Sequence, residues 1–340
     1  MNNTHSVIHR FSFRGLLLAA GIAAVLFGGC KKEDPYIIDG RLPGLFSVSA
    51  TQQVRFSQGN LQWSPVGSHA VKGGGTAAGT WRFAEHQYDV IGSSSSYPNS
   101  YYLGTVSGSD NALVATEGYA GWMDLFGWGT SGYNIESPYT NSLWPCINLD
   151  TIYDSSSISG TNYDWGVYNA ISNGGNAPDQ WRTLTRDEWD YLINTRSAST
   201  VNGTSDARYA LIRVYDGVQE IPGLLLLPDA FTWPSAAGTA PSTINGHGDG
   251  SSWSDAPDYT LTQFAALEAA GCVFLPASGV RDKDVRPSVR GAGRSGLYWS
   301  STKNYDTYAF YIEFSYGYLG TTDYFRNRGQ AVRLVQDKLD

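Results

Sequence analysis

The sequence predicts an α+β fold, in which short strands and long loops are interrupted by two helices. From Phe46 onward, short apolar or alternating runs are separated by clusters of Gly, Ser, Asn and Pro, a pattern typical of strands joined by loops. Aromatic residues make up 14% of the chain and glycines number 39, which favours a loop-rich β protein over a helical one. Two helix-start signals interrupt this pattern, and we therefore expect helices packed against a sheet.

Two capping boxes mark the predicted helix starts. Thr185 is followed three residues later by Glu188, and Thr260 by Gln263, so that each pair can satisfy backbone amides at a helix N-terminus. The apolar faces that follow are Trp189, Leu192 and Ile193 in the first helix and Leu261, Phe264 and Leu267 in the second. Gly271 supplies the stop of the second helix.

Strands are expected between and after these helices. Their predicted positions are residues 209–214, 223–228, 272–276, 297–301, 309–314 and 331–335. The run 309–314 alternates, with Phe310, Ile312 and Phe314 on one face and Tyr311 and Glu313 on the other. Residues 235–258 are rich in Gly, Ser, Pro and Asp, which predicts an exposed loop.

The N-terminus is typical of an exported protein. Arg10 and Arg14 precede an apolar run of about 12 residues, well short of the roughly 20 needed to span a bilayer. The ending Leu26–Cys30 resembles the bacterial lipobox, which implies that residues 1–29 are a signal peptide and that Cys30 is lipidated. Residues 30–44 then form the lipidated cysteine and linker, and residues 45–336 the folded domain.

The predicted location is the outer membrane, with the domain lipid-anchored and exposed at the cell surface. Residues 31–34 resemble the surface-export signal of Bacteroidetes lipoproteins, and an ordinary solvated linker is the alternative. The lipid anchor is the one membrane contact that we expect.

Charge and cysteine usage limit the classes of partner and site. The chain has 31 Asp and Glu against 23 scattered Lys and Arg, and loss of Arg10 and Arg14 makes the mature protein more acidic still, so we expect no nucleic-acid partner. Cys146 and Cys272 either form a disulfide or remain buried free thiols. Neither lies in a metal-ligand spacing, and no zinc site is predicted.

A series of motifs along residues 45–336 resembles a known family. The motifs are FSQGNLQ (56–62), WRFAEHQYDVIG (81–92), GWMDLFGWGTSGYN (121–134), NYDWGVYNAISNGG (162–175), WRTLTRDEWDYL (181–192), CVFLPASG (272–279), YWSS (298–301) and RGQAVRLV (328–335). Together they resemble the Bacteroidetes surface lipoproteins that contain the FISUMP-type "major paralogous" domain. This resemblance implies a C-type lectin-like fold, in which two helices flank a small twisted antiparallel sheet, related to the formylglycine-generating-enzyme fold.

The same resemblance raises the hypothesis of a diversified protein. Some proteins of this group are variable proteins of diversity-generating retroelements, whose C-terminal codons are rewritten to alter ligand specificity. A candidate variable region then spans about 297–335. Its expected fixed residues are Gly296, Trp299, Ser300, Ser301, Ala309, Phe314, Gly329, Val332, Arg333 and Val335. Between Asn304 and Arg328, Glu313 alone lies outside the set of residues that adenine-directed rewriting of Asn codons can produce.

The residues between these fixed positions are candidates for ligand binding. Six tyrosines fall between residues 305 and 324, and tyrosine is favoured in binding loops because it offers a rigid, amphipathic surface. The alternative is that about half of them pack the sheet. The candidate residues are Asn304, Tyr305, Asp306, Tyr308, Tyr311, Glu313, Tyr316, Tyr318, Asp323, Tyr324 and Arg326.

No catalytic constellation or cofactor is predicted. The resemblance to formylglycine-generating enzymes would require a close cysteine pair, and the C-terminal half contains Cys272 alone. The histidines that follow the signal peptide, His69, His86 and His247, are far apart in sequence, and no spacing singles out a carboxylate pair for hydrolysis. A structural calcium ion in the loop 246–255 stays open, although that loop lacks an EF-hand pattern.

The sequence therefore predicts a non-enzymatic, surface-displayed binding protein. Its partner is an unidentified protein or carbohydrate. The first alternative is a glycan-capturing accessory lipoprotein that uses exposed tryptophans such as Trp63, Trp122 or Trp253. The second is a structural adhesin subunit with no small ligand.

Overall fold

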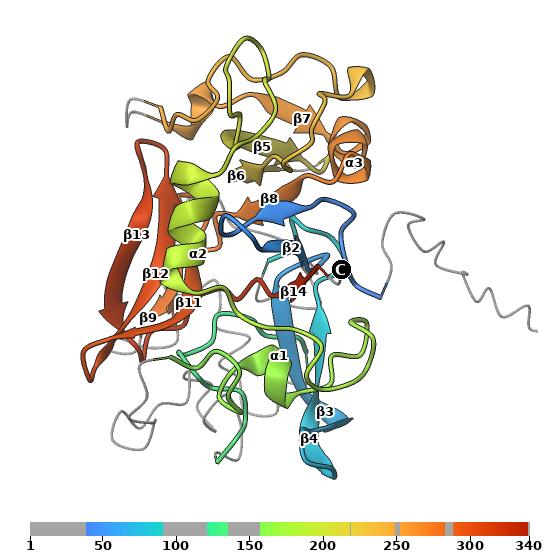
Figure 1. Cartoon of the computed structure of the whole chain (residues 1–340), viewed down its shortest axis with the longest axis vertical. Coiled ribbons are helices and arrows are strands. Elements are labelled where there is room, and N and C mark those ends of the chain that lie inside the picture. The colour runs from blue at the N-terminus through green and yellow to red at the C-terminus, as the bar shows by residue number, and fades with distance from the viewer. Residues whose placement is uncertain are drawn as a thin grey trace, which may run out of the picture. The chain divides into compact units, whose positions relative to one another are not determined.

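The computed structural model describes residues 39–90, 121–134, 157–217, 219–248, 252–282 and 288–338. The signal peptide, the lipidation site Cys30 and the thiol Cys146 lie outside these residues. The structure is mostly β, with 39% strand and 12% helix. Its strands form five small sheets within the described residues (Figure 1).

The five sheets combine segments that are near and far in sequence. The first has the order β1-β2-β14, and two others are the pairs β3-β4 and β9-β10. The remaining two have the orders β7-β5-β6-β8 and β11-β12-β13. The strands are β1 (Phe46–Ser47), β2 (Gln53–Phe56), β3 (Leu61–Ala70), β4 (Thr76–Phe83), β5 (Tyr209–Tyr215), β6 (Glu220–Leu226), β7 (Asp258–Thr260), β8 (Val273–Pro276), β9 (Val280–Asp282), β10 (Ser288–Arg290), β11 (Ser295–Asn304), β12 (Tyr308–Ser315), β13 (Tyr318–Phe325) and β14 (Val335–Asp337).

The helices are short. They are α1 (Trp165–Tyr168), α2 (Arg186–Asp190), which continues as the π-helix η1 (Tyr191–Thr195), the single-turn 3₁₀ helices η2 (Ser235–Ala237) and η3 (Trp253–Asp255), and α3 (Leu261–Ala269). Both predicted capping boxes are confirmed. The Thr185 hydroxyl accepts from the Glu188 amide at 3.2 Å, and the Glu188 carboxylate accepts from the Thr185 amide at 2.7 Å. Thr260 and Gln263 form the same reciprocal pair.

The predicted α+β fold, with two helices flanking one sheet in a C-type lectin-like arrangement, is wrong. Helix α2 packs against β11, β12 and β13, whereas α3 packs against β5 and β7 of another sheet. The strand-forming runs are separated by turns rich in Gly and Asn, and they therefore form several small sheets instead of one. Helix α3 ends after nine residues, just before Gly271 adopts a φ of +91° that favours glycine.

Most predicted elements are confirmed, with two local exceptions, one in a strand and one in a helix. The run 331–335 is not a strand, because residues 332–334 are irregular and β14 begins only at Val335. Leu261 does not share the buried face of α3 but remains exposed at its N-terminus, while Phe264 and Leu267 are buried. A strand that the composition did not predict, β13, contains Gly320 and Asp323, residues that are uncommon in strands.

The sheet β7-β5-β6-β8 is buried on both faces through most of its length. Leu224, Leu226 and Leu275 belong to one hydrophobic cluster, whereas Leu225 and Phe274 belong to a second cluster on the other side. This explains the continuous apolar run in β6, since alternate residues of a strand point to opposite faces.

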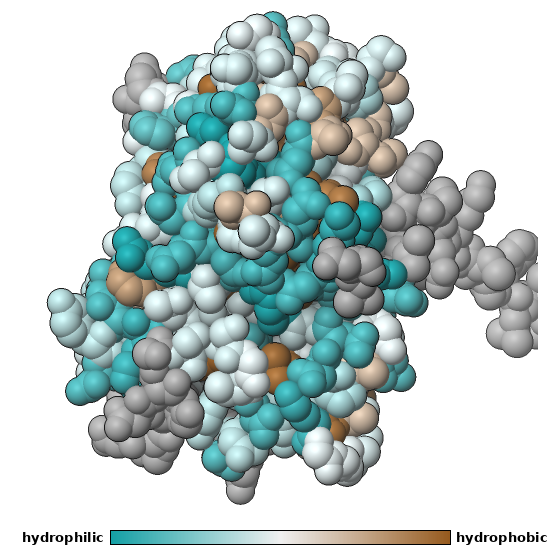
Figure 2. All heavy atoms as spheres, viewed as in Figure 1, coloured by the Kyte–Doolittle hydropathy of each residue, from teal (hydrophilic) through white to brown (hydrophobic). Residues whose placement is uncertain are grey.

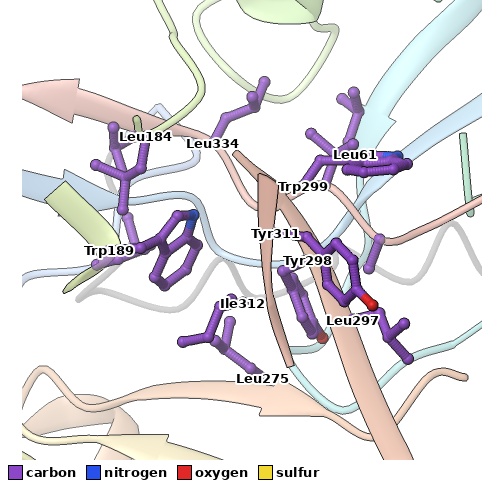
Figure 3. Packing of buried hydrophobic residues seen from close by; sticks show 14 of the residues in the cluster. Leu61, Leu184, Trp189, Leu275, Leu297, Tyr298, Trp299, Tyr311, Ile312 and Leu334 are labelled. Carbon is purple, nitrogen blue, oxygen red and sulfur yellow. The ribbon is translucent and has the colours of Figure 1, made fainter. Parts of the chain in front are cut away.

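The sheet β11-β12-β13 is covered differently on its two faces. Ile312 pairs with Tyr298 of β11 on the face toward α2, and Figure 3 shows Ile312 on the same side as Trp189 of that helix. On the opposite face Trp299 pairs with Tyr311, and the two rings meet edge to face at 5.8 Å. Strand β13 forms one edge of this sheet and lies at the left in Figure 1.

Candidate ligand-binding surface

Four candidate residues gather on the face of β12 and β13 that points away from α2. The register places Tyr311 opposite Thr322, Glu313 opposite Gly320, and Tyr318 and Tyr324 in the same row of β13. Because alternate residues share a face, these side chains form one surface. We call it the tyrosine face and define it by Tyr311, Glu313, Tyr318, Thr322 and Tyr324.

The absence of a side chain at Gly320 shapes the centre of the tyrosine face. A Cβ atom at Gly320 would lie 3.0 Å from the hydroxyl oxygen of Tyr318, so the Tyr318 ring leans over this glycine. Tyr318 is nevertheless 43% exposed. Its ring therefore offers an accessible apolar side while its hydroxyl points along the sheet.

Charged groups lie beside these rings. The guanidinium carbon of Arg328 is 3.6 Å from the centre of the Tyr324 ring, a cation–π contact. Burial raises the pKa of Glu313, while the hydrogen bond from Tyr311 and the positive charge of Arg328 oppose that rise. Burial also raises the pKa of Tyr311, whose hydroxyl donates to Glu313 at 3.5 Å. The face can thus donate, accept and stack within one small area.

The end of β11 and the turn that follows it carry three further candidates, Asn304, Tyr305 and Asp306. Tyr305 is 77% exposed and has a φ of +55°, a backbone conformation that is uncommon for an aromatic residue. Lys303 pairs with Asp306 at 3.6 Å, and Arg326 donates to the carbonyl of Asp306. These contacts hold the turn while its tyrosine side chain projects into solvent.

The remaining candidates do not join the tyrosine face. Tyr308 and Asp323 lie on the α2 face of the sheet, as the register requires. Tyr316 lies in the turn between β12 and β13, where its ring is 5.8 Å from that of Trp253. Arg326 is buried, with its guanidinium carbon 5.6 Å from the Trp128 ring, and supports the Asp306 turn.

The residues expected to stay fixed differ from the candidates in burial. All ten are buried in the structure. The eleven candidates, by contrast, are all at least partly exposed except Tyr311 and Arg326. Burial therefore separates the expected fixed positions from nine of the eleven candidates.

Sequence reasoning missed Arg328 as part of this surface. Arg328 follows β13 by three residues, and nothing in its spacing distinguishes it from Arg326, whose side chain is buried. Its place over Tyr324 depends on the turn after the strand, in which the Arg328 amide donates to the Phe325 carbonyl at 3.1 Å. A turn of that kind leaves no local sequence signal.

The tryptophans proposed for glycan capture are not an exposed set. Trp63 is buried in the core. Trp122 is half-buried beneath Arg82, whose guanidinium carbon lies 3.9 Å from the ring centre. Trp253 is half-buried, and its indole N–H donates to the Arg294 carbonyl at 2.8 Å. Figure 2 shows a largely hydrophilic surface on the side in view, with isolated hydrophobic residues.

Two side chains that could carry chemistry, His69 and Cys272, are buried. His69 is buried, with one ring nitrogen 2.7 Å from the Asn169 side-chain oxygen and the other 2.9 Å from the Gly79 carbonyl oxygen. Burial raises the pKa of the Cys272 thiol. In the described part of the chain, no three His, Cys, Asp or Glu residues come together as metal ligands, and no helix has the length and apolarity to cross a membrane.

Comparison with known families finds a match to the segment that carries the tyrosine face. The profile of a domain of unknown function (DUF8237) matches residues 261–335, the stretch from α3 to the start of β14. The chain is similar to that family over this segment, which includes the whole tyrosine face. No curated protein and no solved structure matches the chain.

Proposed function

We propose that this protein is an exported, lipid-anchored binding protein that recognises its ligand with the tyrosine face and the exposed turn at Tyr305. Cys30 carries the lipid, the outer membrane holds the protein, and the domain that follows is displayed at the cell surface. The assignment to the FISUMP-type surface lipoproteins belongs to the same proposal and rests on the motif series.

The observation that carries this proposal is the clustering of Tyr311, Glu313, Tyr318 and Tyr324 on one sheet face beside Arg328. Tyrosine rings bury much area at little entropic cost, and the charged groups add directional hydrogen bonds. A protein epitope or a carbohydrate offers matching chemistry, because both present apolar patches next to hydrogen-bonding groups.

Glycan capture through tryptophans is the weaker alternative. Stacking on sugars needs an exposed ring, whereas Trp63 is buried and Trp253 packs against Tyr316. An adhesin role, in which the protein is a structural subunit without a small ligand, remains compatible with the same surface if the ligand is a protein.

The proposal is tested on a glycan array and on an array of purified surface proteins, each probed with the full chain. We expect binding by the parent chain and its loss, by tenfold or more, in the triple variant Tyr305→Ser, Tyr318→Ser, Tyr324→Ser. The matched control is Tyr215→Ser, because Tyr215 is 41% exposed but lies on β5. Equal binding by the triple variant and the control would refute the assignment of this surface.

Diversification by a retroelement is the second part of the proposal. All ten expected fixed residues are buried and nine of the eleven candidates are at least partly exposed, which supports such a division; Tyr311 and Arg326 depart from it. Sequences of the gene from related strains test this point. Substitutions should concentrate at accessible positions between 303 and 326, and a reverse-transcriptase gene with a near-copy of the 3′ end should lie nearby. A neighbourhood without either element would exclude it.

A further inference from the structure

Strand β13 has an open edge. Its eight residues pair with β12 in an uninterrupted register, and no strand pairs with its other side within the described residues. The opposite edge of the same sheet, formed by β11, is occupied. The backbone amide of Trp299 donates to the Ala331 carbonyl at 3.0 Å, and the backbone amide of Ser301 donates to the Leu184 carbonyl at 2.8 Å. Among the described residues, the unpaired edge of this sheet is therefore the edge of β13.

The register identifies the backbone groups at this edge. The Arg326 amide donates to the Thr307 carbonyl at 2.9 Å, so the even-numbered residues of β13 direct their backbone groups toward β12. Because the direction alternates along an antiparallel strand, Leu319, Thr321 and Asp323 direct theirs outward. The backbone groups of these three residues make no hydrogen bond within the described chain outside the β12–β13 ladder.

This edge has little of the usual protection against pairing, since Asp323 is the one charged residue of the strand. Exposed edges are commonly blocked by proline, lysine, a β-bulge or a short strand. Strand β13 contains no proline or lysine, shows no register shift against β12, and is eight residues long. An edge of this kind pairs readily with another strand.

We propose that the edge of β13 pairs with the same edge of a second copy of this chain, antiparallel and about a two-fold axis at Thr321. The axis is normal to the sheet, so that each face of the sheet continues into the second copy. Because the axis passes at Thr321, this residue lies opposite Thr321 of the second copy, and Leu319 lies opposite Asp323 of the second copy. The outward groups of all three residues then pair across the axis. On the other face Tyr318 lies opposite Tyr324, and such aromatic cross-strand pairs are favourable.

The distribution of rings along β13 selects a second copy as the occupant. Arg328 lies over Tyr324 near one end of the strand, and Tyr318, which leans over Gly320, lies at the other end. Antiparallel pairing places the Arg328–Tyr324 pair of one copy beside the Tyr318 ring of the other. It also keeps the single acid of the strand, Asp323, away from its own counterpart and opposite Leu319.

The test uses the lipidated full chain in detergent. The variant Thr321→Cys should give an intermolecular disulfide dimer as its major species on mild oxidation, because directly opposite residues of a hydrogen-bonded pair have Cα atoms about 5.5 Å apart. Val66→Cys, at an exposed position on β3, is the matched control for random collision and should give no more dimer than the parent chain. Equal dimer yields from the two variants would overturn the proposal, as would an adduct with a different protein.

A second variant tests the interface without new cysteines. Thr321→Lys places two like charges together at the axis while leaving the hydrogen bonds to β12 in place. In sedimentation the parent chain should be a dimer and this variant a monomer that keeps the circular dichroism spectrum of the parent chain, whereas Val66→Lys should still be dimeric. A monomeric parent chain, or a variant that remains dimeric, contradicts the proposal.

Discussion

The sheets β7-β5-β6-β8 and β11-β12-β13 show how burial on one or both faces determines which residue types a strand can carry. In the first, β6 and β8 are buried at every position except Glu220, since hydrophobic clusters cover both faces. In the second, every residue of β13 is at least partly exposed. β6 and β8 must therefore be almost entirely apolar, whereas β13 can carry Gly, Thr, Asp and Tyr.

Buried arginines complete the hydrogen bonding around the first sheet. Arg196 donates to the carbonyls of Leu227 and Arg208 at 2.6 and 3.0 Å and pairs with Asp229 at 2.9 Å. Arg333 donates to the carbonyls of Ser57 and Phe274. Burial lowers the pKa of both guanidinium groups to about 10, so both stay charged at neutral pH. On the tyrosine face Tyr311 is buried, whereas Glu313, Tyr318, Thr322 and Tyr324 are at least partly exposed, which leaves these four side chains available to a ligand.

The largest expected difference between the two sheets is the cost of losing a side chain. Leu225→Ala should lower the free energy of unfolding by about 3 kcal/mol, because it leaves a cavity in a fully buried cluster. Tyr318→Ala should change it by less than about 0.5 kcal/mol, as is usual for surface positions. Urea unfolding of both variants measures the contrast. Similar costs would mean that Tyr318 belongs to the core.

A smaller effect is expected at the helix that covers one face of the β11-β12-β13 sheet. Thr185→Ala removes the cap of α2 and should cost about 1 kcal/mol. Amide hydrogen exchange should then speed up in β12 and β13, against which α2 packs. The matched control is Thr260→Ala, which uncaps α3 beside β5 and β7. Faster exchange in β12 and β13 in this control would contradict an independent role for the two helices.

Local signals predicted local structure well, and the assembly of the sheets less well. The boxes at Thr185 and Thr260 lie within four residues each, so their chemistry is complete in the sequence. The partner of a strand, by contrast, is not specified by neighbouring residues. Strand β14, for example, pairs with β2, which lies near the other end of the domain in sequence. The resemblance to a lectin-like fold supplied a topology in which both helices cover one sheet, and the contacts of α2 and α3 contradict it.

The candidate surface was predicted in part for the same reason. The alternation along β12 correctly predicted that Tyr311 and Glu313 lie on one face of the sheet and Phe310 and Ile312 on the other. This was possible because alternate residues of any strand point to opposite faces. The alternation did not reveal that β13 adds Tyr318 and Tyr324 to the same face, since this follows from the β12–β13 register. It also did not distinguish Arg326, which packs inward near Trp128, from Arg328, which stacks on Tyr324.

The smallest expected effect is the pH dependence that Glu313 gives to the tyrosine face. Its pKa in the folded protein is raised above 4.5 by burial, so near that pH the folded state holds a proton that the unfolded state has released. This contribution to stability is fully present below about pH 4 and is lost as the pH rises through the folded-state pKa. Relative to Glu313→Gln, the parent chain should therefore be more stable at pH 4 than at pH 7.

Urea unfolding of the parent chain and Glu313→Gln at both pH values gives this difference directly. Titratable groups that are present in both proteins contribute equally to the two unfolding free energies and cancel in the difference. Asp337, whose pKa is lowered by its hydrogen bonds and ion pair with Arg182, is one of these groups. An opposite sign would mean that the Tyr311 hydroxyl and Arg328 stabilise the carboxylate more than burial penalises it. The tyrosine face would then be a preorganised anionic site, and its ligand should be sought among molecules that present a cation.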